Sequence, residues 1–262
     1  MIEIRPQPRQ EHFLSSPADV VIYGGAAGGG KTFSILLEPL RNIQNKRFGA
    51  VIFRRTFPEI TREGGMWDEA LAIYPLAGGK PNRTDMFYRF PSGAKISFAA
   101  MQFEDDKEGW KSAQIPLIEF DQLETFTAGQ FFYLFSRNRS TCGVRPYIRA
   151  TCNPEPGWLA DFLDWWIAED GYANLERSGV LRWMVRLGDD QIAWFDTELQ
   201  AKEAHPDIPP KSVTFIPATV YDNQELLQRD PGYIANLKAL TLVDRERLLG
   251  DVQRGGNWKI KP

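Results

Sequence analysis

One short segment constrains this chain more than any other: residues 25–32 read G-A-A-G-G-G-K-T and match the pattern G-x-x-x-x-G-K-T. The apolar run 20–23 comes directly before this segment, and helix-like sequence follows it. In such a loop the glycines turn successive backbone N–H groups into one concavity, where they can bind phosphate. A glycine-rich linker with a chance lysine is the alternative, and the flanking strand and helix disfavour it.

The loop therefore predicts a nucleotide site in which Lys31 reaches the terminal phosphates and the Thr32 hydroxyl can ligate Mg²⁺. The start of a helix near Lys31 adds its positive dipole end to the same place. We expect ATP and Mg²⁺ as the ligands. The loop residues predicted to bind the nucleotide are Gly25, Ala26, Ala27, Gly28, Gly29, Gly30, Lys31 and Thr32.

Composition excludes several other classes of protein. The chain has 262 residues, enough for one large α/β core or for a core and a small appendage. Two cysteines and two histidines make a disulfide framework or a zinc site improbable, so a reducing cytosol is the simplest compartment. No apolar run reaches the length of a membrane span, and the first residues do not resemble a secretory signal.

The net charge of -3 gives no overall basic character, so any contact with nucleic acid must be a local patch. The candidates are two basic clusters, Arg54–Arg55 and the set Arg137, Arg139, Arg145 and Arg149. Solvated surface with salt bridges is the alternative for both clusters.

Alternating strand and helix patterns predict a parallel sheet with helices on both faces. Residues 1–18 are expected to form an irregular leader, and a hairpin is expected near Pro91-Ser92-Gly93-Ala94. Strands are expected at residues 19–23, 50–53, 115–121 and 147–152, and helices from the phosphate loop to about residue 45, across 66–74 and across 128–137.

The pattern changes in the C-terminal third. We expect a second hairpin around Gly188-Asp189-Asp190, then one strand from Ser212 and Leu-rich helices, one of them opened by Pro231. These features predict an ATPase core over residues 1–177 and a small lid or linker subdomain over residues 178–262.

Ligands of parallel α/β sheets bind at the carboxyl ends of the strands, where Gly25, Asp121 and Asn153 all fall. Asp121 ends an apolar strand, which fits the carboxylate that holds a hydrated Mg²⁺ together with Thr32. A helix N-cap is the alternative role for Asp121.

The residue after Asp121 is Gln122, whose neutral amide can orient a water molecule but cannot take its proton. Glu124 lies two positions further on and could act as the proton acceptor instead. Glu119 shares a strand face with Asp121 but lies about 6.6 Å back along the strand, beneath the phosphates. A site that hydrolyses slowly, either naturally or through engineering, is the remaining alternative.

Three further residues are candidates for catalysis. Asn153 could contact the γ-phosphate or the attacking water and report the loss of phosphate, or it could simply end its strand in an Asn-Pro turn. Arg137 and Arg139 could act as an arginine finger on the nucleotide of a neighbouring subunit, or they could cap a helix on the surface.

Taken in order, these segments resemble the ATPase domain of the large terminase subunit of tailed bacteriophages. The resemblance rests on residues 24–32 (GGAAGGGKT), 51–56 (VIFRRT), 90–94 (FPSGA), 117–121 (LIEFD), 134–140 (LFSRNRS), 152–154 (CNP) and 215–218 (FIPA), and it covers nearly the whole chain.

The resemblance implies a P-loop NTPase of the RecA (ASCE) type that moves double-stranded DNA into a procapsid as a ring on the portal protein. It implies the small terminase subunit as a partner, a location in the host cytoplasm with no membrane contact, and a monomer when isolated. It places Arg54 and Arg55 near the nucleotide or the coupling machinery, and Gln7 or Gln10 near the adenine. The family carries Glu where this chain has Gln122. Family members usually continue into a nuclease domain, and we expect no nuclease activity in this chain.

Two other functions compete with a packaging motor. One is a helicase or recombination ATPase that depends on DNA, and the other is a module that binds ATP with little turnover because of Gln122. A GTPase is disfavoured because the guanine-reading pattern N-K-x-D is absent; residues 45–48 read N-K-R-F.

Overall fold

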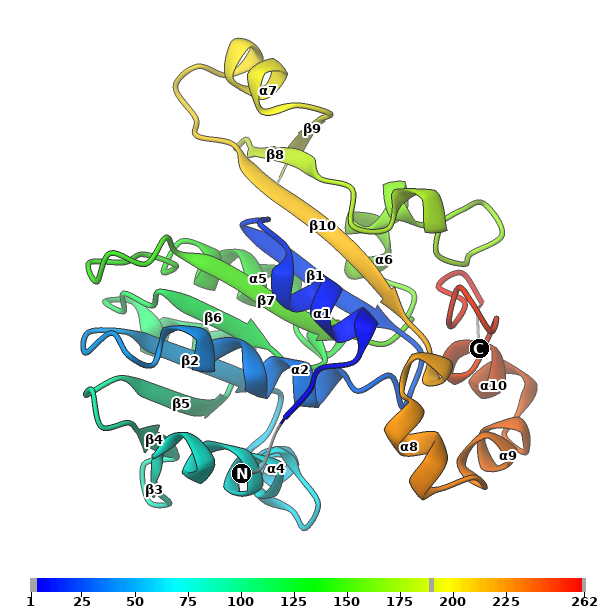
Figure 1. The fold of residues 1–262 in the computed structure, drawn as a ribbon. Coiled ribbons are helices and arrows are strands. Elements are labelled where there is room, and N and C mark those ends of the chain that lie inside the picture. Colours follow the sequence, from blue (N-terminus) through cyan, green and yellow to red (C-terminus); the bar gives the residue numbers. More distant parts are fainter. Residues whose placement is uncertain (1–3, 189–190, 261–262) are drawn as a thin grey trace.

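The computed structural model describes residues 4–188 and 191–260, and a ten-stranded mixed sheet forms its centre (Figure 1). The strand order is β3-β4-β5-β2-β6-β7-β1-β10-β8-β9. The strands from β5 to β10 in this order run parallel, and an antiparallel pair flanks them on each side. The strands are β1 Val20–Gly25, β2 Gly49–Arg54, β3 Lys80–Asn82, β4 Phe87–Arg89, β5 Lys95–Ala100, β6 Leu117–Phe120, β7 Tyr147–Cys152, β8 Arg182–Arg186, β9 Ile192–Phe195 and β10 Lys211–Ala218.

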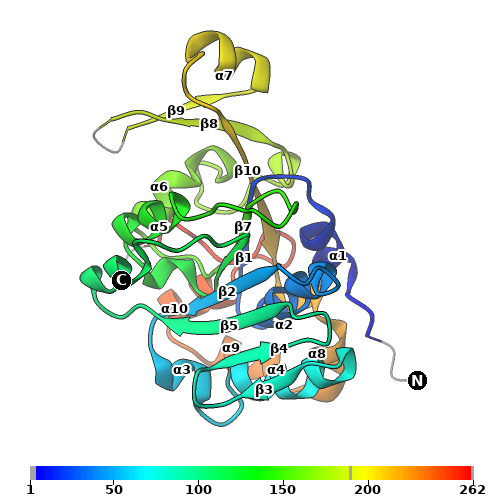
Figure 2. The same cartoon turned by 90° about the vertical axis from the view of Figure 1, so that its left-hand side faces the viewer.

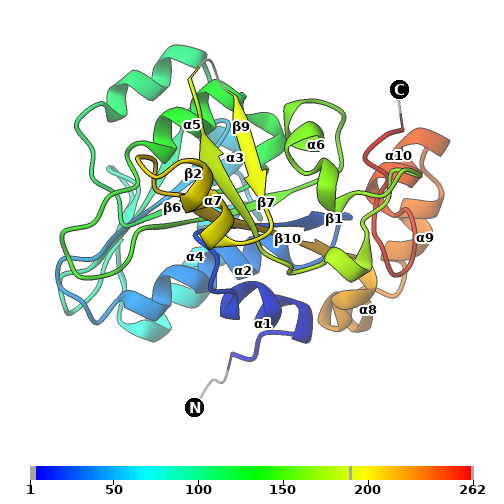
Figure 3. The same ribbon diagram turned by 90° about the horizontal axis from the view of Figure 1, so that it is seen from above.

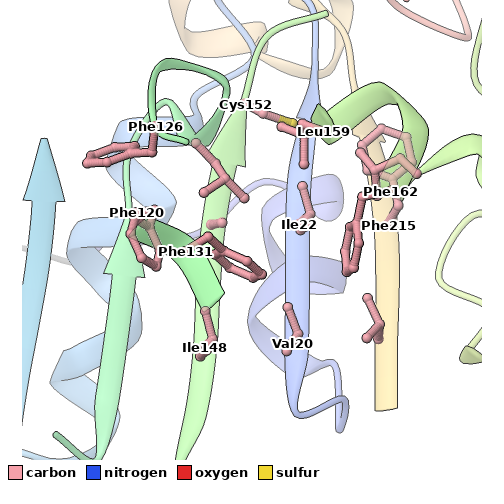
Figure 4. Packing of buried hydrophobic residues seen from close by; sticks show 14 of the residues in the cluster. Val20, Ile22, Phe120, Phe126, Phe131, Ile148, Cys152, Leu159, Phe162 and Phe215 are labelled. Carbon is pink, nitrogen blue, oxygen red and sulfur yellow. The ribbon is translucent and has the colours of Figure 1, made fainter. Parts of the chain in front are cut away.

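The central strands are buried on both faces, which explains why β1 is a continuous apolar run rather than an alternating one, and β6 is apolar except for the buried Glu119. Val20 and Ile22 of β1 face one hydrophobic cluster, whereas Val21 and Tyr23 face the other. Figure 4 shows the first cluster, in which Phe131 packs between β1, β6 and β7.

Helices cover the two faces of the sheet (Figures 1 and 2). Helices α1, α2 and α4 pack on the face of Val21 and Tyr23, and α5 and α6 pack on the opposite face. The helices are α1 Pro8–Ser15, α2 Lys31–Leu37, α3 Phe57–Thr61, α4 Met66–Ile73, α5 Ala128–Phe135, α6 Trp158–Phe162, α7 Glu198–Ala204, α8 Gln224–Arg229, α9 Tyr233–Lys238 and α10 Leu242–Leu248.

Most of the predicted elements are present, including both hairpins, and the mixed α/β sheet flanked by helices confirms the predicted fold class. The turn residues Asp189 and Asp190 lie outside the described residues. The prediction of an irregular leader over residues 1–18 is wrong, because residues 8–15 form α1 with Pro8 at its first position. The helix after the phosphate loop is shorter than expected: Pro39 lacks an N–H group, and a 3-10 turn, Glu38–Asn42, follows Leu37.

The C-terminal third contributes to the same sheet. Strand β10 pairs with β1 in parallel, and β8 and β9 extend the sheet beyond it, so the predicted boundary at residue 178 does not separate two sheets. Helices α8, α9 and α10 gather at one end of the molecule (Figure 3), where Val220, Leu237 and Leu249 form a small core of their own. A separate C-terminal unit stays a prediction, and these three helices are the part that fits it best.

Over residues 4–188 and 191–260, none of the helices has the length and apolar character needed to cross a membrane.

The packing of Phe131 predicts a large effect of truncation. Its fully buried ring contacts the rings of Phe120, Trp158 and Phe162. We expect Phe131→Ala to lower the free energy of unfolding by about 3–5 kcal/mol, because the cavity it leaves is enclosed by the sheet and α5. Urea denaturation measures this change, with Phe103→Ala at a side chain that is 66% exposed as the control. Equal stability of the two variants would contradict the packing described here.

Candidate functional site

The predicted phosphate loop connects β1 to α2 at the carboxyl edge of the sheet. Gly28 and Gly30 adopt left-handed conformations, with φ angles of 75° and 70°. The conformation of Gly30 favours glycine, and a Cβ atom there would lie 2.4 Å from Gln10 Nε2, so it would displace the Gln10 side chain that donates to Gly30 O.

Side-chain donors from three elements hold consecutive carbonyl groups of this loop. Asn223 Nδ2 donates to Gly28 O at 2.7 Å, the Tyr23 hydroxyl to Gly29 O at 3.2 Å, and Gln10 Nε2 to Gly30 O at 3.0 Å. In a planar trans peptide the N–H group points away from the carbonyl group of the preceding residue. The residues that carry the next N–H groups, Gly29, Gly30 and Lys31, line a cleft, and the donors Gln10 and Asn223 line it too.

This cleft has a volume of about 1100 Å³. Loop residues 27–32 line it, together with Asp121, Gln122 and Asn153 from the ends of β6 and β7. Five apolar side chains also line it: Ile4, Phe33, Ile73, Leu226 and Leu248. A cleft lined by a glycine-rich loop, a few polar side chains and several apolar ones suits a nucleotide.

Lys31 opens α2, and its ammonium group donates to the carbonyl oxygen of Ala26 within the loop. Withdrawal from water lowers the pKa of Lys31, and the carboxylates of Glu124 and Asp121 partly oppose this shift. Gly25 and Ala26 lie beneath the cleft, where the Ala26 N–H donates to Ala218 O at 2.9 Å. Of the eight motif residues predicted to bind the nucleotide, only residues 27–32 line the cleft.

Asp121 is buried, and three side chains bind its carboxylate. Thr32 Oγ1 donates to Oδ2 at 3.4 Å, Arg54 Nη2 lies 2.7 Å from the same oxygen, and the Thr151 hydroxyl donates to Oδ1. The hydroxyl of Thr32 and the carboxylate of Asp121 thus face each other across the loop. These oxygen donors fit Mg²⁺, which prefers a few carboxylate and hydroxyl ligands together with phosphate oxygens.

Arg54 lies behind Asp121 rather than on the wall of the cleft. It is buried, and its Nη1 donates to Gln122 Oε1 at 2.7 Å while Nη2 pairs with Asp121. Gln122 has a left-handed backbone with a φ of 63°, and its N–H donates to the Thr151 hydroxyl at 3.0 Å. This conformation is strained for a residue with a Cβ atom, so the surrounding bonds hold Gln122 in place.

Glu124 and Asn153 meet at the same edge of the sheet. Asn153 Nδ2 donates to Glu124 Oε1 at 2.8 Å, and Glu124 Oε2 has no hydrogen-bond partner among the described residues. Burial raises the pKa of Glu124 to about 7, although the charge of Lys31 acts in the opposite direction. A carboxyl group with such a pKa can exchange a proton near neutral pH.

Glu119 lies deeper in the sheet, as its position two residues before Asp121 predicts. It is fully buried beside Glu38 and Arg149, and burial raises its pKa well above the usual range. Neither Glu119 nor Glu124 lines the cleft, but Glu124 is bonded to Asn153, which does, whereas Glu119 lies among Glu38 and Arg149, so the geometry favours Glu124 as the proton acceptor.

Arg137 and Arg139 lie at the opposite edge of the sheet. Arg137 Nη1 donates to Lys111 O and Arg139 Nη2 to Ala113 O, close to the start of β6. Neither can reach the cleft of its own chain, so a role in a neighbouring subunit's site stays a prediction.

The sequence analysis did not identify Asn223 and Tyr23 as site residues. It expected Gln10 near the adenine, whereas Gln10 binds the loop carbonyl of Gly30. Gln7 Nε2 donates to Asn223 Oδ1 at 2.9 Å, so α1 and the start of α8 are joined beside the loop. No local motif signals this contact, because Asn223 is 195 residues from Gly28 in the sequence.

A phosphate loop after one strand and an aspartate at the end of another, with one parallel strand between the two, define a P-loop NTPase. Within that class, residues 22–260 match the family model described as "Terminase large subunit, T4likevirus-type, N-terminal". The chain therefore belongs to the family of terminase large subunits and represents their N-terminal region.

Solved structures show the same fold. The large terminase of a thermophilic bacteriophage in complex with ADP is 13% identical, with a TM-score of 0.59 over 97% of this chain and 54% of that one. The complex of the same terminase with ATP-gamma-S gives 14% identity and a TM-score of 0.56 over 96% of this chain and 52% of that one. The large terminase ATPase domain of Thermus phage P74-26 is 12% identical, with a TM-score of 0.55 over 94% of this chain and 93% of that one.

This chain thus spans about half the length of the first of these large terminases. A search among curated proteins finds no match.

The contact between Asn223 and the loop gives a testable prediction. We expect Asn223→Ala to weaken the binding of a nucleoside triphosphate about two- to thirteenfold, because a hydrogen bond of this kind contributes about 0.5–1.5 kcal/mol. Isothermal titration calorimetry measures the affinity.

Two variants complete that measurement. Asn223 also caps α8, so Thr197→Ala, which removes the cap of α7 away from the loop (Figure 1), is the matched control. Lys31→Ala should abolish binding. Full affinity in Lys31→Ala would overturn the assignment of the loop, and full affinity in Asn223→Ala would overturn its positioning role.

Proposed function

We propose that this chain is an ATPase motor domain that couples ATP binding and hydrolysis to movement of double-stranded DNA into a procapsid. Membership of the terminase family supports the cellular role. The single observation that carries the chemistry is the meeting of Lys31, Thr32 and Asp121 at one cleft.

In this proposal the loop N–H groups and Lys31 bind the phosphates of ATP, and Gln7 or Gln10 lies near the adenine. Thr32 and Asp121 hold Mg²⁺, which supplies charge neutralisation on the phosphates when it is bound. Arg54 keeps the Asp121 carboxylate oriented toward Thr32.

Glu124 is the proposed proton acceptor for the attacking water. It is the carboxyl group nearest in sequence after Asp121, and Asn153 fixes the orientation of one of its oxygens. Asn153 also lines the cleft, so it can sense the terminal phosphate and pass its loss to Glu124. The amide of Gln122 can orient the water that Glu124 deprotonates. In the family pattern, one glutamate at the position of Gln122 both orients and deprotonates this water.

The geometry also favours a second candidate, a domain that binds ATP and turns it over slowly. Arg54 holds the amide of Gln122, and this amide cannot take a proton at the position where the family carries Glu. The two candidates differ only in the rate of hydrolysis, and both keep the nucleotide in the same cleft.

The partners proposed for the working motor are double-stranded DNA, the portal protein, the small terminase subunit and the procapsid, in the host cytoplasm. The proposed state is a ring on the portal and a monomer when isolated. Stimulation of ATP turnover by portal and procapsid would separate a packaging motor from a helicase or recombination ATPase, which requires neither.

The raised pKa of Glu124 predicts the pH dependence of turnover. Below a pH of about 7 the carboxyl group is protonated and cannot accept a proton, so turnover should rise as the pH increases through about 7. Phosphate release with saturating ATP and Mg²⁺ measures the profile. A flat profile between about pH 6 and pH 8 would contradict Glu124 as the base.

Substitutions then locate the base. We expect Glu124→Gln to lower turnover at least about 100-fold and to leave ATP affinity nearly unchanged, whereas the exposed Glu63→Gln should change neither. Gln122→Glu should raise turnover, because it adds a carboxylate at the edge of the cleft. If Glu124→Gln is silent and Gln122→Glu gains nothing, the interpretation of this edge of the site is wrong.

A further inference from the structure

The basic clusters expected from the sequence to contact DNA are largely engaged within the protein. Arg54 pairs with Asp121, and Arg55 Nη1 donates to Gln130 Oε1 at 2.8 Å. Arg149 is buried, and its Nη1 donates to Ala18 O at 3.0 Å. Arg145 pairs with Asp19 at 2.6 Å, and Arg137 and Arg139 bind backbone carbonyls.

A different group of cations is brought together by the register of β3, β4 and β5. Lys80 lies opposite Arg89, and Arg89 lies opposite Lys95, so three basic side chains stand in one row across three neighbouring strands. Tyr88 and Ile96 point into the hydrophobic core. Because side chains alternate along a strand, the row projects from the other face of the sheet. Figure 2 shows these strands side by side at one end of the sheet.

The row has an aromatic centre. Lys95 Nζ lies 4.3 Å from the centroid of the Phe87 ring, and Arg89 Cζ lies 5.5 Å from it. Lys80 and Arg89 are exposed, and Lys95 is half-buried. Within residues 4–188 and 191–260, none of the three side chains forms an ion pair or a hydrogen bond.

Like charges directly opposite each other destabilise a sheet, so this row needs an explanation. Natural sheets often protect an edge strand with Lys and Pro, which accounts for Lys80 and Pro81 in β3. That explanation does not extend to Arg89 and Lys95, because β4 and β5 are paired on both sides. A polyanion that lies across the strands would relieve the repulsion.

Two further cations lie on a segment next to the turn before Lys95. The exposed Lys46 and Arg47 precede β2, and a Cβ atom at Gly93, in the turn before Lys95, would lie 3.3 Å from Lys46 O. We propose that Lys80, Arg89 and Lys95, with Lys46 and Arg47 beside them, bind the phosphate backbone of double-stranded DNA. That the polyanion is double-stranded DNA rests on the proposed function, whereas the row of cations rests on the structure.

The surface is connected to the nucleotide site. Strand β5 pairs with β2 along its length, and Ala100 at its end lies opposite Arg54, whose side chain binds Asp121 and Gln122. The distance along β5 from Lys95 to Ala100 is about 17 Å. One ladder of backbone hydrogen bonds therefore joins the strand that carries Lys95 to the strand that carries Arg54.

The test uses the whole chain and a labelled blunt DNA duplex of about 30 base pairs, with fluorescence anisotropy at about 50 to about 200 mM salt and no nucleotide. We expect the double variant Arg89→Ala/Lys95→Ala to bind several-fold more weakly at low salt. We also expect the slope of log affinity against log salt to become shallower by about two, because two phosphate contacts are lost.

Two matched variants distinguish position from charge. Arg62→Ala/Lys238→Ala removes the same charge from exposed positions elsewhere and should bind as the original chain does. Arg89→Lys/Lys95→Arg keeps the charges and should keep both affinity and slope. Thermal unfolding checks that all variants are folded, and basal ATP turnover in the alanine variant should equal that of the original chain.

The proposal is wrong if the alanine variant retains the original affinity and slope, or if it changes the oligomeric state and leaves DNA binding intact. Failure of the original chain to hydrolyse ATP would count against the proposed function. It would not contradict the proposed DNA surface, provided that DNA binding still depends on Arg89 and Lys95.

Discussion

The carboxylate of Asp121 is the contact on which the rest of the site depends. Asp121 directly follows β6, and its carboxylate accepts from Thr151 of the neighbouring strand β7 and from Thr32 of α2 while it pairs with Arg54 of β2. Four elements therefore meet at one buried charge. A buried carboxylate is stable only with such partners, so the strand register and the site geometry constrain each other.

The phosphate loop shows a second constraint, which comes from far along the chain. Its carbonyl groups are held by Tyr23, Gln10 and Asn223, and the Ala27 N–H donates to Leu248 O at 2.8 Å at the end of α10. The C-terminal helices thus contact the backbone of the loop directly. Any ligand that recruits the Ala27 N–H group must compete with α10, which gives nucleotide binding a route to these helices.

The sequence by itself determined the class of fold and the centre of the site. Residues 25–32, the strand-end Asp121 and the alternating strands and helices encode local geometry, and local geometry is what glycine patterns and hydrophobic periodicity report. The depth of Glu119 also followed from its spacing to Asp121. The first helix was missed, because its start depends on Gln7 and Gln10, which are not typical capping residues.

Only the tertiary structure decided which distant side chains support these local elements. Asn223 reaches Gly28 because β10 returns beside β1, and Lys80, Arg89 and Lys95 form a row because of the register of three strands. Arg137 and Arg139 lie at the edge of the parallel sheet opposite the cleft, because the chain from α5 to β7 returns to the amino ends of the strands. Such contacts depend on strand order and register, and no local pattern in a single sequence specifies either of them.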